Sequence, residues 1–434
     1  MTDRGDDVSI CIRGGRVIDP SQNLDEVTDL WINDGKIAGI GPQSLEATKT
    51  LEATGKIVCP GLIDMHVHFR EPGGEADETI ATGAASAVAG GVTSTACMPN
   101  TSPAIDSVET VELIYQRARE AEQSNVFPIG AISQYRAGEE PVDFEALTKA
   151  GAVAFTDDGS PVVNSQLMRR AMEICKDLDR CILSHSEDPT LSLNGVMNEG
   201  EVSRELGVQG YPALAEEIMI FREIGLAEMT GARAHILHVS SAVGVELIRR
   251  GKDRGVRITG EACPHHFTLT DESLRGRDTH FKMSPPLRTQ KDIDAILEGL
   301  QDGTLDVLAT DHAPHSPEKK SRPLETAPNG IIGLESFLPI CIQALIETDM
   351  LTWPQMIEKM TINPARILSI DRGTLQVGKI ADVTIIDPDE EWTISADAMQ
   401  SKSRNCPFDG WQVKGRAQTV IIAGEETLTR PSNK

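Results

Sequence analysis

The spacing of hydrophobic and polar residues divides the chain into three parts. Residues 8–55 contain short hydrophobic runs separated by turns rich in Gly, Asn and Asp, a pattern typical of antiparallel strands. The turn Asn33–Gly35 predicts a tight hairpin between two such runs, and Arg13-Gly14 predicts a second turn. Strand-like runs return after residue 370. The two ends of the chain therefore predict one small β domain.

Between these ends, strand-like runs alternate with amphipathic helical segments. The strand-like runs are Ile57–His68, Val92–Met98, Val126–Ile132, Ala152–Thr156, Cys181–His185, Ala234–Val239, Val256–Ala262 and Val307–Asp311. Eight alternating units over about 300 residues predict a (β/α)8 barrel of the TIM type. The competing open, doubly wound sheet normally carries a Gly-rich phosphate-binding loop after its first strand, and the sequence has no such motif.

The predicted fold class is therefore α/β: a (β/α)8 barrel with a small β-sandwich domain built from both chain termini. The predicted boundaries are 1–56 for the N-terminal part of the β domain, 57–370 for the barrel and 371–434 for the C-terminal part. A barrel places its first and last strands side by side, which brings the two ends of the chain together.

Composition and charge restrict the function. The chain has 434 residues, no stretch as long as a membrane span and a polar, acidic start unlike a secretory signal. Eight scattered cysteines without Cys-x-x-Cys pairs indicate reduced thiols, so we expect a cytoplasmic protein. The net charge of -25 argues against nucleic acid or membrane partners. An anionic substrate would need a local cation to hold it.

Residues with metal-binding chemistry follow five of the predicted strands. His66 and His68 end the first strand and, being two residues apart, lie on the same face. The other ends carry Asp157-Asp158, His185, His238 and Asp311. In a barrel of this type these strand ends meet at one face, where reacting groups lie. The set suits Zn²⁺ and exceeds the roughly three protein ligands that one catalytic zinc takes, so it predicts two ions sharing a bridging carboxylate.

The ligands divide between the two predicted ions by position. We assign His66, His68 and Asp311 to one ion and His185 and His238 to the other. The bridge comes from the fourth strand, where chemistry alone does not separate Asp157 from Asp158. Asp311 can also take the proton of an attacking hydroxide and deliver it to a leaving nitrogen. The predicted reaction is hydrolysis of an amide-like bond, with Asp311 as the catalytic residue.

Several longer stretches resemble a known family. They read PGLIDMHVHFREPG, ACMPNTSP, AFTDDGSPV, MNEGEVSRELG, HVSSAVGVELIRR, CPHH, ATDHAPHSPEKK and SKSRNCPF. They are similar to class I dihydroorotases of the amidohydrolase superfamily, and together they cover nearly the whole chain. The resemblance implies zinc-dependent, reversible cyclisation of N-carbamoyl-L-aspartate to L-dihydroorotate with loss of water, in de novo pyrimidine (UMP) biosynthesis. It also implies that a metal-bridging hydroxide attacks the ring amide.

The resemblance also implies roles for individual residues. It places the bridging ligand at Asp158, where hydantoinases use a carboxylated lysine. It implies the substrate-binding residues His68, Arg70, Asn100, Ser284, His315, Asn329 and Gly330. A guanidinium such as that of Arg70 can hold a carboxylate through two hydrogen bonds. Two of these positions depart from the family pattern, which usually has Asn in place of Ser284 and Phe in place of Asn329. Both face the substrate, so they affect affinity more than the reaction.

Two alternatives belong to different classes of function. A related cyclic amidase, such as a hydantoinase or allantoinase, is disfavoured because strand four carries no lysine. A non-catalytic dihydroorotase-like subunit of an aspartate transcarbamoylase complex would be expected to lose metal ligands, and here the set is complete. The expected partner is a small anionic substrate. Homo-oligomerisation or association with the transcarbamoylase is left open.

The remaining polar residues receive structural interpretations. Neighbouring strand residues point to opposite faces, so at most one of His265 and His266 contacts substrate. We interpret His235, His280 and His312 as non-ligands. Lys319-Lys320 is predicted to lie in a solvated loop, and Asp77 is predicted to be a surface carboxylate.

Overall fold

The computed structural model describes residues 9–42 and 47–431. Residues 1–8 and 432–434, which belong to the two predicted halves of the β domain, lie outside the described residues. Within the described part, no helix combines the length and apolar character needed to span a bilayer.

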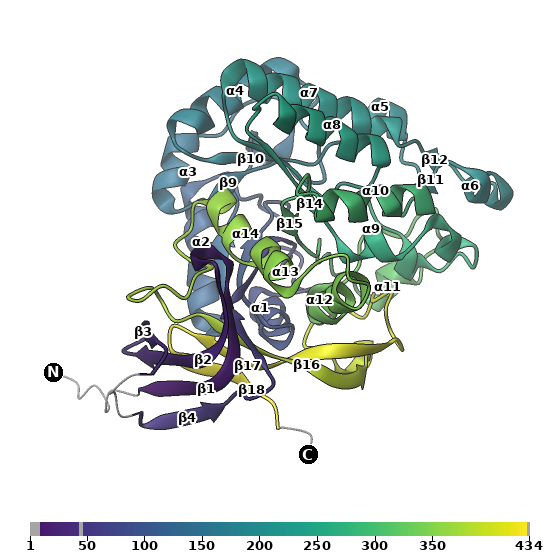
Figure 1. Ribbon diagram of the computed structural model, residues 1–434. Helices are drawn as coiled ribbons and strands as arrows, with labels where there is room; N and C mark the ends of the chain where they lie inside the picture. Colours follow the sequence, from purple (N-terminus) through teal and green to yellow (C-terminus); the bar gives the residue numbers. More distant parts are fainter. Residues whose placement is uncertain (1–8, 43–46, 432–434) are drawn as a thin grey trace.

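Strands from both ends of the chain form one eight-stranded sheet, drawn at the bottom of Figure 1. It contains β1 (Ile10–Asp19), β2 (Leu24–Asn33), β3 (Lys36–Ile40), β4 (Lys49–Glu52), β5 (Ile57–Pro60), β16 (Val383–Thr393), β17 (Gln412–Ile422) and β18 (Glu425–Thr429). Their order is β18-β17-β16-β5-β1-β2-β3, and β4 pairs with β1. The prediction that the two chain ends build a common β unit is confirmed by this pairing.

The two predicted turns of the N-terminal part have different outcomes. Asp34 and Gly35 adopt φ values of 48° and 68° and connect β2 to β3 as the expected tight hairpin. The predicted turn at Arg13-Gly14 is wrong, because β1 runs through it as one strand. The pairing with β2 shifts register between Ile12 and Gly15, so this Gly marks a β-bulge.

Gly61 joins the terminal sheet to the parallel strands. The predicted strand over residues 57–68 is split there into β5, which pairs with β1 and β16, and β6 (Leu62–Val67), which pairs with β7. A Cβ atom on Gly61 would lie only 2.1 Å from the Thr93 side chain, so a larger residue does not fit. The first ligand-bearing strand is thus a direct continuation of the terminal sheet.

Eight parallel strands lie at the centre of the second region. They are β6, β7 (Val92–Cys97), β8 (Asn125–Pro128), β9 (Ala154–Phe155), β10 (Cys181–Ser184), β13 (Ala234–Ile236), β14 (Ile258–Ala262) and β15 (Val307–Leu308). They form two sheets, β6-β7-β8 and β15-β14-β13-β10-β9. Isolated parallel bridges connect Gly130 with Phe155 and Val67 with His312. The predicted single closed sheet is therefore present only as these two sheets and two bridges.

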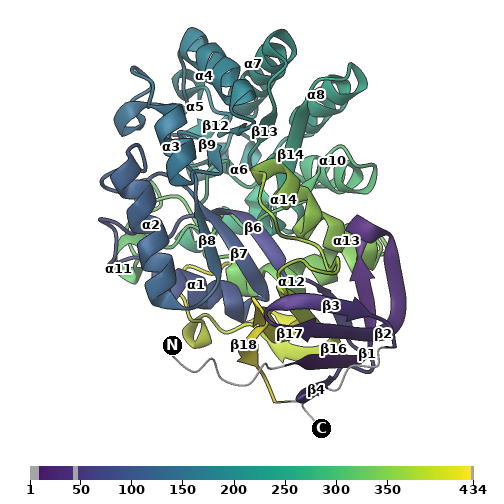
Figure 2. The same ribbon diagram turned by 90° about the vertical axis from the view of Figure 1, so that its left-hand side faces the viewer.

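Helices surround the parallel strands on the outside, as Figure 2 shows. The longer ones are α1 (Ile80–Ala89), α2 (Val108–Ala121), α3 (Phe144–Ala150), α4 (Ser165–Asp177), α6 (Glu201–Leu206), α7 (Leu214–Thr230), α8 (Ala242–Asp253), α10 (Gln290–Gln301), α12 (Leu334–Cys341), α13 (Trp353–Met360) and α14 (Ile362–Leu368). Shorter elements are α5 (Pro189–Ser192), α9 (Pro264–Thr268), α11 (Pro317–Lys320), β11 (Met197–Asn198) and β12 (Gly210–Tyr211). Side-chain capping boxes begin α1 at Thr79 and α2 at Ser107.

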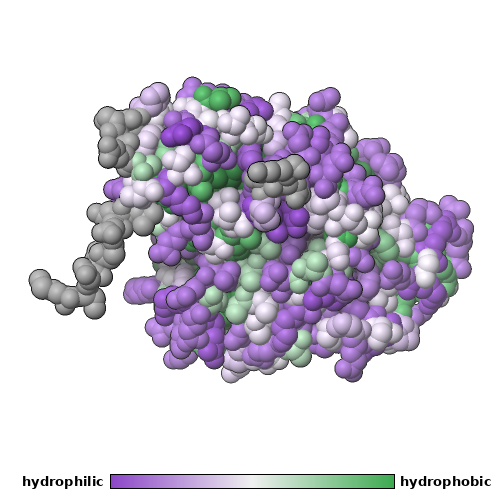
Figure 3. All heavy atoms as spheres, turned by 90° about the horizontal axis from the view of Figure 1, so that it is seen from below, coloured by the Kyte–Doolittle hydropathy of each residue, from purple (hydrophilic) through white to green (hydrophobic). Residues whose placement is uncertain are grey.

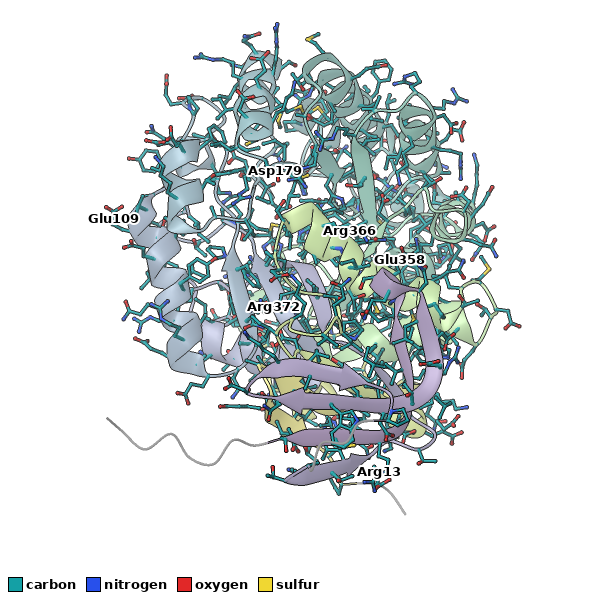
Figure 4. All side chains as sticks on the ribbon, turned by 60° about the vertical axis from the view of Figure 1, so that its left-hand side comes forward. Arg13, Glu109, Asp179, Glu358, Arg366 and Arg372 are labelled. Atoms are coloured by element: carbon teal, nitrogen blue, oxygen red, sulfur yellow. The ribbon has the colours of Figure 1, made fainter. Side chains whose placement is uncertain are left out.

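A buried carboxylate links the two regions. Asp382 accepts hydrogen bonds from Asn125 at the start of β8 and from the backbone of Ala423, and it pairs with Arg372 at 2.9 Å. Arg372 is labelled in Figure 4.

Most of the face seen from below in Figure 3 is hydrophilic, with small scattered hydrophobic areas. The terminal sheet keeps a hydrophobic cluster of its own, which includes Ile12, Val58 and Ile385.

Candidate functional site

The candidate site begins at the end of β6, where every residue is buried. The alternation of a strand directs His66 and His68 to the same side. Their Nε2 atoms lie 3.4 and 3.0 Å from Oδ1 of Asp311, which follows β15. The three predicted ligands of the first ion are therefore close together, although they are separated by more than 240 residues in the sequence.

Asp158 lies between this group and the remaining histidines. Its carboxylate oxygens are 3.7 Å from His66 Nε2 and 3.5 Å from His68 Nε2. On the other side they are 3.2 Å from His185 Nδ1 and 3.7 Å from His238 Nε2. One carboxylate thus contacts both predicted ligand groups, as a bridging ligand would.

The neighbouring Asp157 has a different environment. Its carboxylate accepts hydrogen bonds from the backbone N–H groups of Ile132 and Ser133 at 2.8 and 3.1 Å, and also from the Ser133 hydroxyl. These bonds hold the loop after β8 and leave the carboxylate directed away from the histidines. Of the two aspartates that chemistry alone left open, Asp158 is therefore the one that lies beside the four histidines.

Three of the histidines are held by a hydrogen bond at the ring nitrogen that does not face Asp158. His66 Nδ1 donates to Glu261 at 2.5 Å, and His68 Nδ1 donates to Oδ1 of Asn100 at 2.8 Å. His185 Nε2 donates to Glu187 at 3.1 Å. Such contacts fix the ring orientation and leave the other ring nitrogen free for a metal. The sequence interpretation missed Glu261 and Glu187, although a glutamate inside the hydrophobic run of β14 is a visible signal.

The electrostatics of the site favour positive charge. Burial opposes the protonation of His66, but Glu261 and Asp311 outweigh it and raise its pKa to about 10. Burial likewise opposes the protonation of His185, and Asp158 with Glu187 raises its pKa to about 10. Carboxylates that stabilise a protonated imidazole also stabilise a metal cation in its place.

The donor set fits divalent metal ions. Among the described residues, four groups have ligand atoms that all lie within 4.8 Å of one another, and three of them belong to this site: His66, His68 and Asp158; His66, His238 and Asp311; and Asp158, His185 and His238; the fourth is Cys263, His265 and His266. The atoms His66 Nε2 and Asp158 Oδ1 are buried and have no hydrogen-bond partner. Such atoms are costly to bury without a partner, and a cation between them would satisfy both.

A cavity of about 360 Å³ opens onto these ligands, and its volume suits a small molecule. All of the predicted substrate residues line it: His68, Arg70, Asn100, Ser284, His315, Asn329 and Gly330. Arg70 donates to the Pro314 carbonyl at 3.2 Å and has no carboxylate within ion-pair distance among the described residues. Its guanidinium is therefore a cationic group that lines the cavity without a paired carboxylate in the described part of the chain.

Two of the predicted ligands have left-handed backbone conformations. His238 and Asp311 adopt φ values of 34° and 50°, a region that residues other than Gly rarely occupy. Asp64 supports the second of these positions, because it accepts hydrogen bonds from the Thr310 backbone and side chain at 3.2 and 2.5 Å. Burial raises the pKa of Asp64 to about 7, against these hydrogen bonds.

Two predictions about residues near the cavity are wrong. Asp77 is not on the surface: it is 3% exposed and accepts hydrogen bonds from the Ser316 backbone and Lys319. Lys320 is not solvated either, since it is also 3% exposed. Asp77 lies between β6 and α1 and is covered by Ser316 and Lys319, whereas Lys320 follows β15 and is covered by residues 328–330.

The histidines interpreted as structural have protein partners. His235 donates to Glu261 at 3.1 Å, and the His312 ring accepts from the Gly333 backbone at 3.2 Å. His266 donates to the Pro285 carbonyl at 2.9 Å and so supports the segment that carries Ser284.

The sequence is similar to known proteins over almost its full length. A family model described as "Dihydro-orotase-like" matches residues 55–243. A dihydroorotase of a Geobacter species is 50% identical over 420 residues, covering 96% of this chain and 99% of the relative. The dihydroorotase of Geobacter metallireducens is 48% identical over 425 residues, covering 98% and 100%.

The fold is similar to that of solved hydantoinases. The L-hydantoinase from Arthrobacter aurescens superimposes with a TM-score of 0.88 at 24% identity and covers 98% of this chain and 96% of its own. The D-hydantoinase from a Thermus species gives a TM-score of 0.82 at 22% identity, covering 97% and 95%. At these identities the likeness concerns the fold alone.

Proposed function

The chain belongs to the dihydroorotase family, and from this premise we propose how its site carries out the reaction. Its function is accordingly dihydroorotase activity, the reversible cyclisation of N-carbamoyl-L-aspartate to L-dihydroorotate with loss of water. The enzyme is a hydrolase of cyclic amides from a metal-dependent superfamily. The proposals below concern the metal, the catalytic residue and the substrate contacts.

We propose that the site binds two Zn²⁺ ions. His66, His68 and Asp311 hold one ion, His185 and His238 hold the other, and Asp158 bridges them. The observation that carries this proposal is the position of Asp158, within 3.7 Å of a ring nitrogen of each of the four histidines. Bound zinc supplies a nucleophile at neutral pH, because it lowers the pKa of coordinated water to about 7.

Asp311 is proposed to move the proton. Burial opposes its charge, but His66 and His68 outweigh burial and hold the pKa of the Asp311 carboxyl well below its usual range. The group is therefore a carboxylate at neutral pH and can accept a proton on the cavity side. In ring opening it then delivers this proton to the ring nitrogen that leaves, and ring closure reverses both steps.

The substrate carboxylate is proposed to bind Arg70 and Asn100. The Oδ1 atom of Asn100 accepts from His68, so its amide N–H group remains to donate to the substrate. The same side chain would thus orient a metal ligand and hold the substrate. Ser284, His315 and the backbone of Asn329 and Gly330, which also line the cavity, complete the proposed contacts.

We also propose that the two parallel sheets belong to one (β/α)8 barrel within residues 57–370 and that residues 1–56 and 371–434 form a separate β-sandwich domain, to which β5 at the boundary contributes its strand. Support for the barrel comes from the bridges at Gly130–Phe155 and Val67–His312, which join the sheets at both edges. Support for the second domain is its own hydrophobic cluster.

A homo-oligomer formed through α7 is a further proposal. The helix leaves Leu214, Phe221 and Met229 exposed by 51%, 68% and 65%, and their spacing of seven and eight residues puts them on one face. A stable dimer buries about 800 Å² per partner, more than one helix face provides. The contact with a second copy would therefore extend to α4 and α8, which pack beside α7 and expose Ile174 and Val243.

Two expectations concern the cellular location of the protein and its association with a second enzyme. A cytoplasmic location fits the eight cysteines, all of which are free and buried. Association with aspartate transcarbamoylase stays a prediction.

The decisive experiment combines a dihydroorotate hydrolysis assay with zinc quantification on the wild type and Asp311→Asn. We expect the variant to lose turnover by about a thousandfold, since it lacks the proton acceptor. Asp349→Asn is a matched control, because Asp349 is exposed and also adopts a positive φ, 59°.

Each result has a clear consequence. Less than one equivalent of zinc in active wild type contradicts the two-ion site. Near-normal turnover of Asp311→Asn contradicts the proton transfer by this residue. No hydrolysis by the zinc-loaded wild type at any pH contradicts the function itself.

A further inference from the structure

Lys320, the last residue of α11, has an unusual environment. Its side chain is buried, and its ammonium group donates to the backbone carbonyls of Pro328 and Gly330 at 3.1 and 3.0 Å. A third, longer contact reaches the Lys282 carbonyl at 3.4 Å. Among the described residues no carboxylate lies within ion-pair distance of this ammonium group. The direct hydrogen-bond partners of this ammonium group are therefore all neutral carbonyl groups.

Those carbonyls belong to one wall of the substrate cavity. Pro328, Asn329 and Gly330 all line the cavity, and the Asn329 carbonyl accepts a hydrogen bond from His315 Nε2 at 2.7 Å. The two carbonyls bound by Lys320 flank Asn329 on either side. The ammonium group thus binds this backbone on the side away from the cavity, and the other side of the same backbone faces the substrate.

Lys282 continues this arrangement. It is buried, and its ammonium group donates to the carbonyls of Leu324 and Ala327, both at 2.7 Å. Its own carbonyl accepts from the Gly330 backbone at 2.9 Å. Residues 321–330 contain no helix or strand. The segment therefore depends on side-chain contacts, chiefly from these two lysines, to keep its shape.

The close packing around Gly330 restricts movement of the backbone at this residue. Its φ is 126°, and a Cβ atom there would lie 2.7 Å from the Ala313 side chain and 2.9 Å from the Ala313 carbonyl. Asn405 donates to the same Gly330 carbonyl at 3.0 Å. A backbone packed this closely cannot shift without changing the cavity wall.

Burying an ammonium group without a counter-ion costs free energy, and a methionine would fill the same volume without that cost. This free-energy cost is offset because the N–H groups of the ammonium fix a backbone segment that belongs to no helix or strand. Burial and the nearby Lys282 lower the pKa of Lys320 to about 7, against the attraction of Asp278, which is consistent with this cost.

We propose that Lys320 is a positioning residue for substrate binding, because its ammonium group fixes the Pro328–Gly330 backbone as one wall of the cavity. The inference rests on the proposed function in one respect only: the ligand of the cavity is dihydroorotate. Lys320 touches neither the substrate nor the metal ligands, so its effect on the reaction passes through this backbone.

The test compares two buried lysines that bind backbone carbonyls. Lys320→Met removes the donors behind the cavity wall. Lys359→Met is the matched control, since Lys359 is buried on α13 and donates to the Leu305 carbonyl, away from the cavity. We expect Lys320→Met to raise the KM for dihydroorotate by at least about tenfold, with a smaller change in kcat and unchanged zinc content.

The control variant is expected to lose thermal stability while its KM stays at the wild-type value. Lys320→Arg retains a cation with several donors and is expected to recover most of the lost affinity. Lys320→Gln, a milder change, decides the question if Lys320→Met does not fold. A wild-type KM in both Lys320→Met and Lys320→Gln overturns the proposal, as does an equal KM shift in Lys359→Met. Inactive zinc-loaded wild type instead overturns the function and not the position of the wall.

Discussion

Glu261 accepts a hydrogen bond from Nδ1 of His66 at 2.5 Å, and this contact determines which nitrogen of His66 faces the metal site. The same carboxylate accepts from His235 and from the His238 backbone, at 3.1 and 3.0 Å. One buried glutamate therefore holds two of the proposed ligands, one through its side chain and the other through its backbone.

Glu261→Gln is expected to weaken zinc binding by about 10- to 100-fold, because partners of this kind orient the ligating ring and increase its basicity. Competition with a chelator of known affinity measures this change. Glu223→Gln is the control, since Glu223 is also a fully buried glutamate but pairs with Arg222 on α7. Equal zinc affinities of Glu261→Gln and the wild type would show that His66 is oriented by other contacts.

Lys320 predicts a dependence of stability on pH. Its pKa is about 7 in the folded chain and about 10.4 when unfolded, so between these values the unfolded state binds more protons. Stability of the wild type therefore rises with pH over this range relative to Lys320→Met, by on the order of a few kcal/mol. Melting temperatures of both proteins at pH 6.5 and 9.5, values chosen to bracket most of this range, test the sign. Parallel pH dependences would mean that Lys320 is solvated in the native protein.

The exposed face of α7 predicts the state of association. Phe221→Glu places a charge at the centre of the proposed contact, so we expect it to convert oligomers to monomers. Light scattering during size-exclusion chromatography measures the mass. Val27→Glu is the control, because Val27 is 74% exposed but lies on β2 in the terminal sheet. A monomeric wild type, or an oligomer unchanged in Phe221→Glu, would exclude this contact.

The cysteines predict the reactivity of the native protein. All eight are free and buried, and burial raises the pKa of the Cys97 and Cys181 thiols to about 12. Because the thiolate is the reactive form, a disulfide reagent at pH 8 is expected to modify essentially no thiol in the native state. Eight thiols should react after unfolding in denaturant. One fast-reacting native thiol would indicate an opening of the fold that exposes it.

The grouping of the proposed ligand side chains could be predicted because each lies at the end of a strand with a strong pattern. His66 and His68 are two apart in a hydrophobic run, and Asp311 follows another such run directly. The rules for parallel strands bring such ends together whatever their separation in sequence. Which of Asp157 and Asp158 lies beside the histidines could not be predicted, because it depends on which carboxylate binds the backbone N–H groups of Ile132 and Ser133.

Residues that act through long-range contacts could not be predicted in this way. From the sequence, Lys320 is expected to be a solvated charge beside Lys319. It is buried because residues 328–330 fold back over its side chain. Asp77 is covered by Ser316 and Lys319. Local patterns report the secondary structure around a residue, whereas these two environments are set by a segment without any periodic pattern.

The short connection at Gly61 has a consequence for the order of events during synthesis. One edge of β5 pairs with β1, and its other edge pairs with β16, which begins at Val383. During synthesis, β5, which leads directly into the strand that carries His66, therefore keeps one unpaired edge until more than 300 further residues have been translated. We expect zinc to bind late, after the C-terminal strands have emerged from the ribosome. The synthesis of these strands therefore determines when the enzyme becomes active.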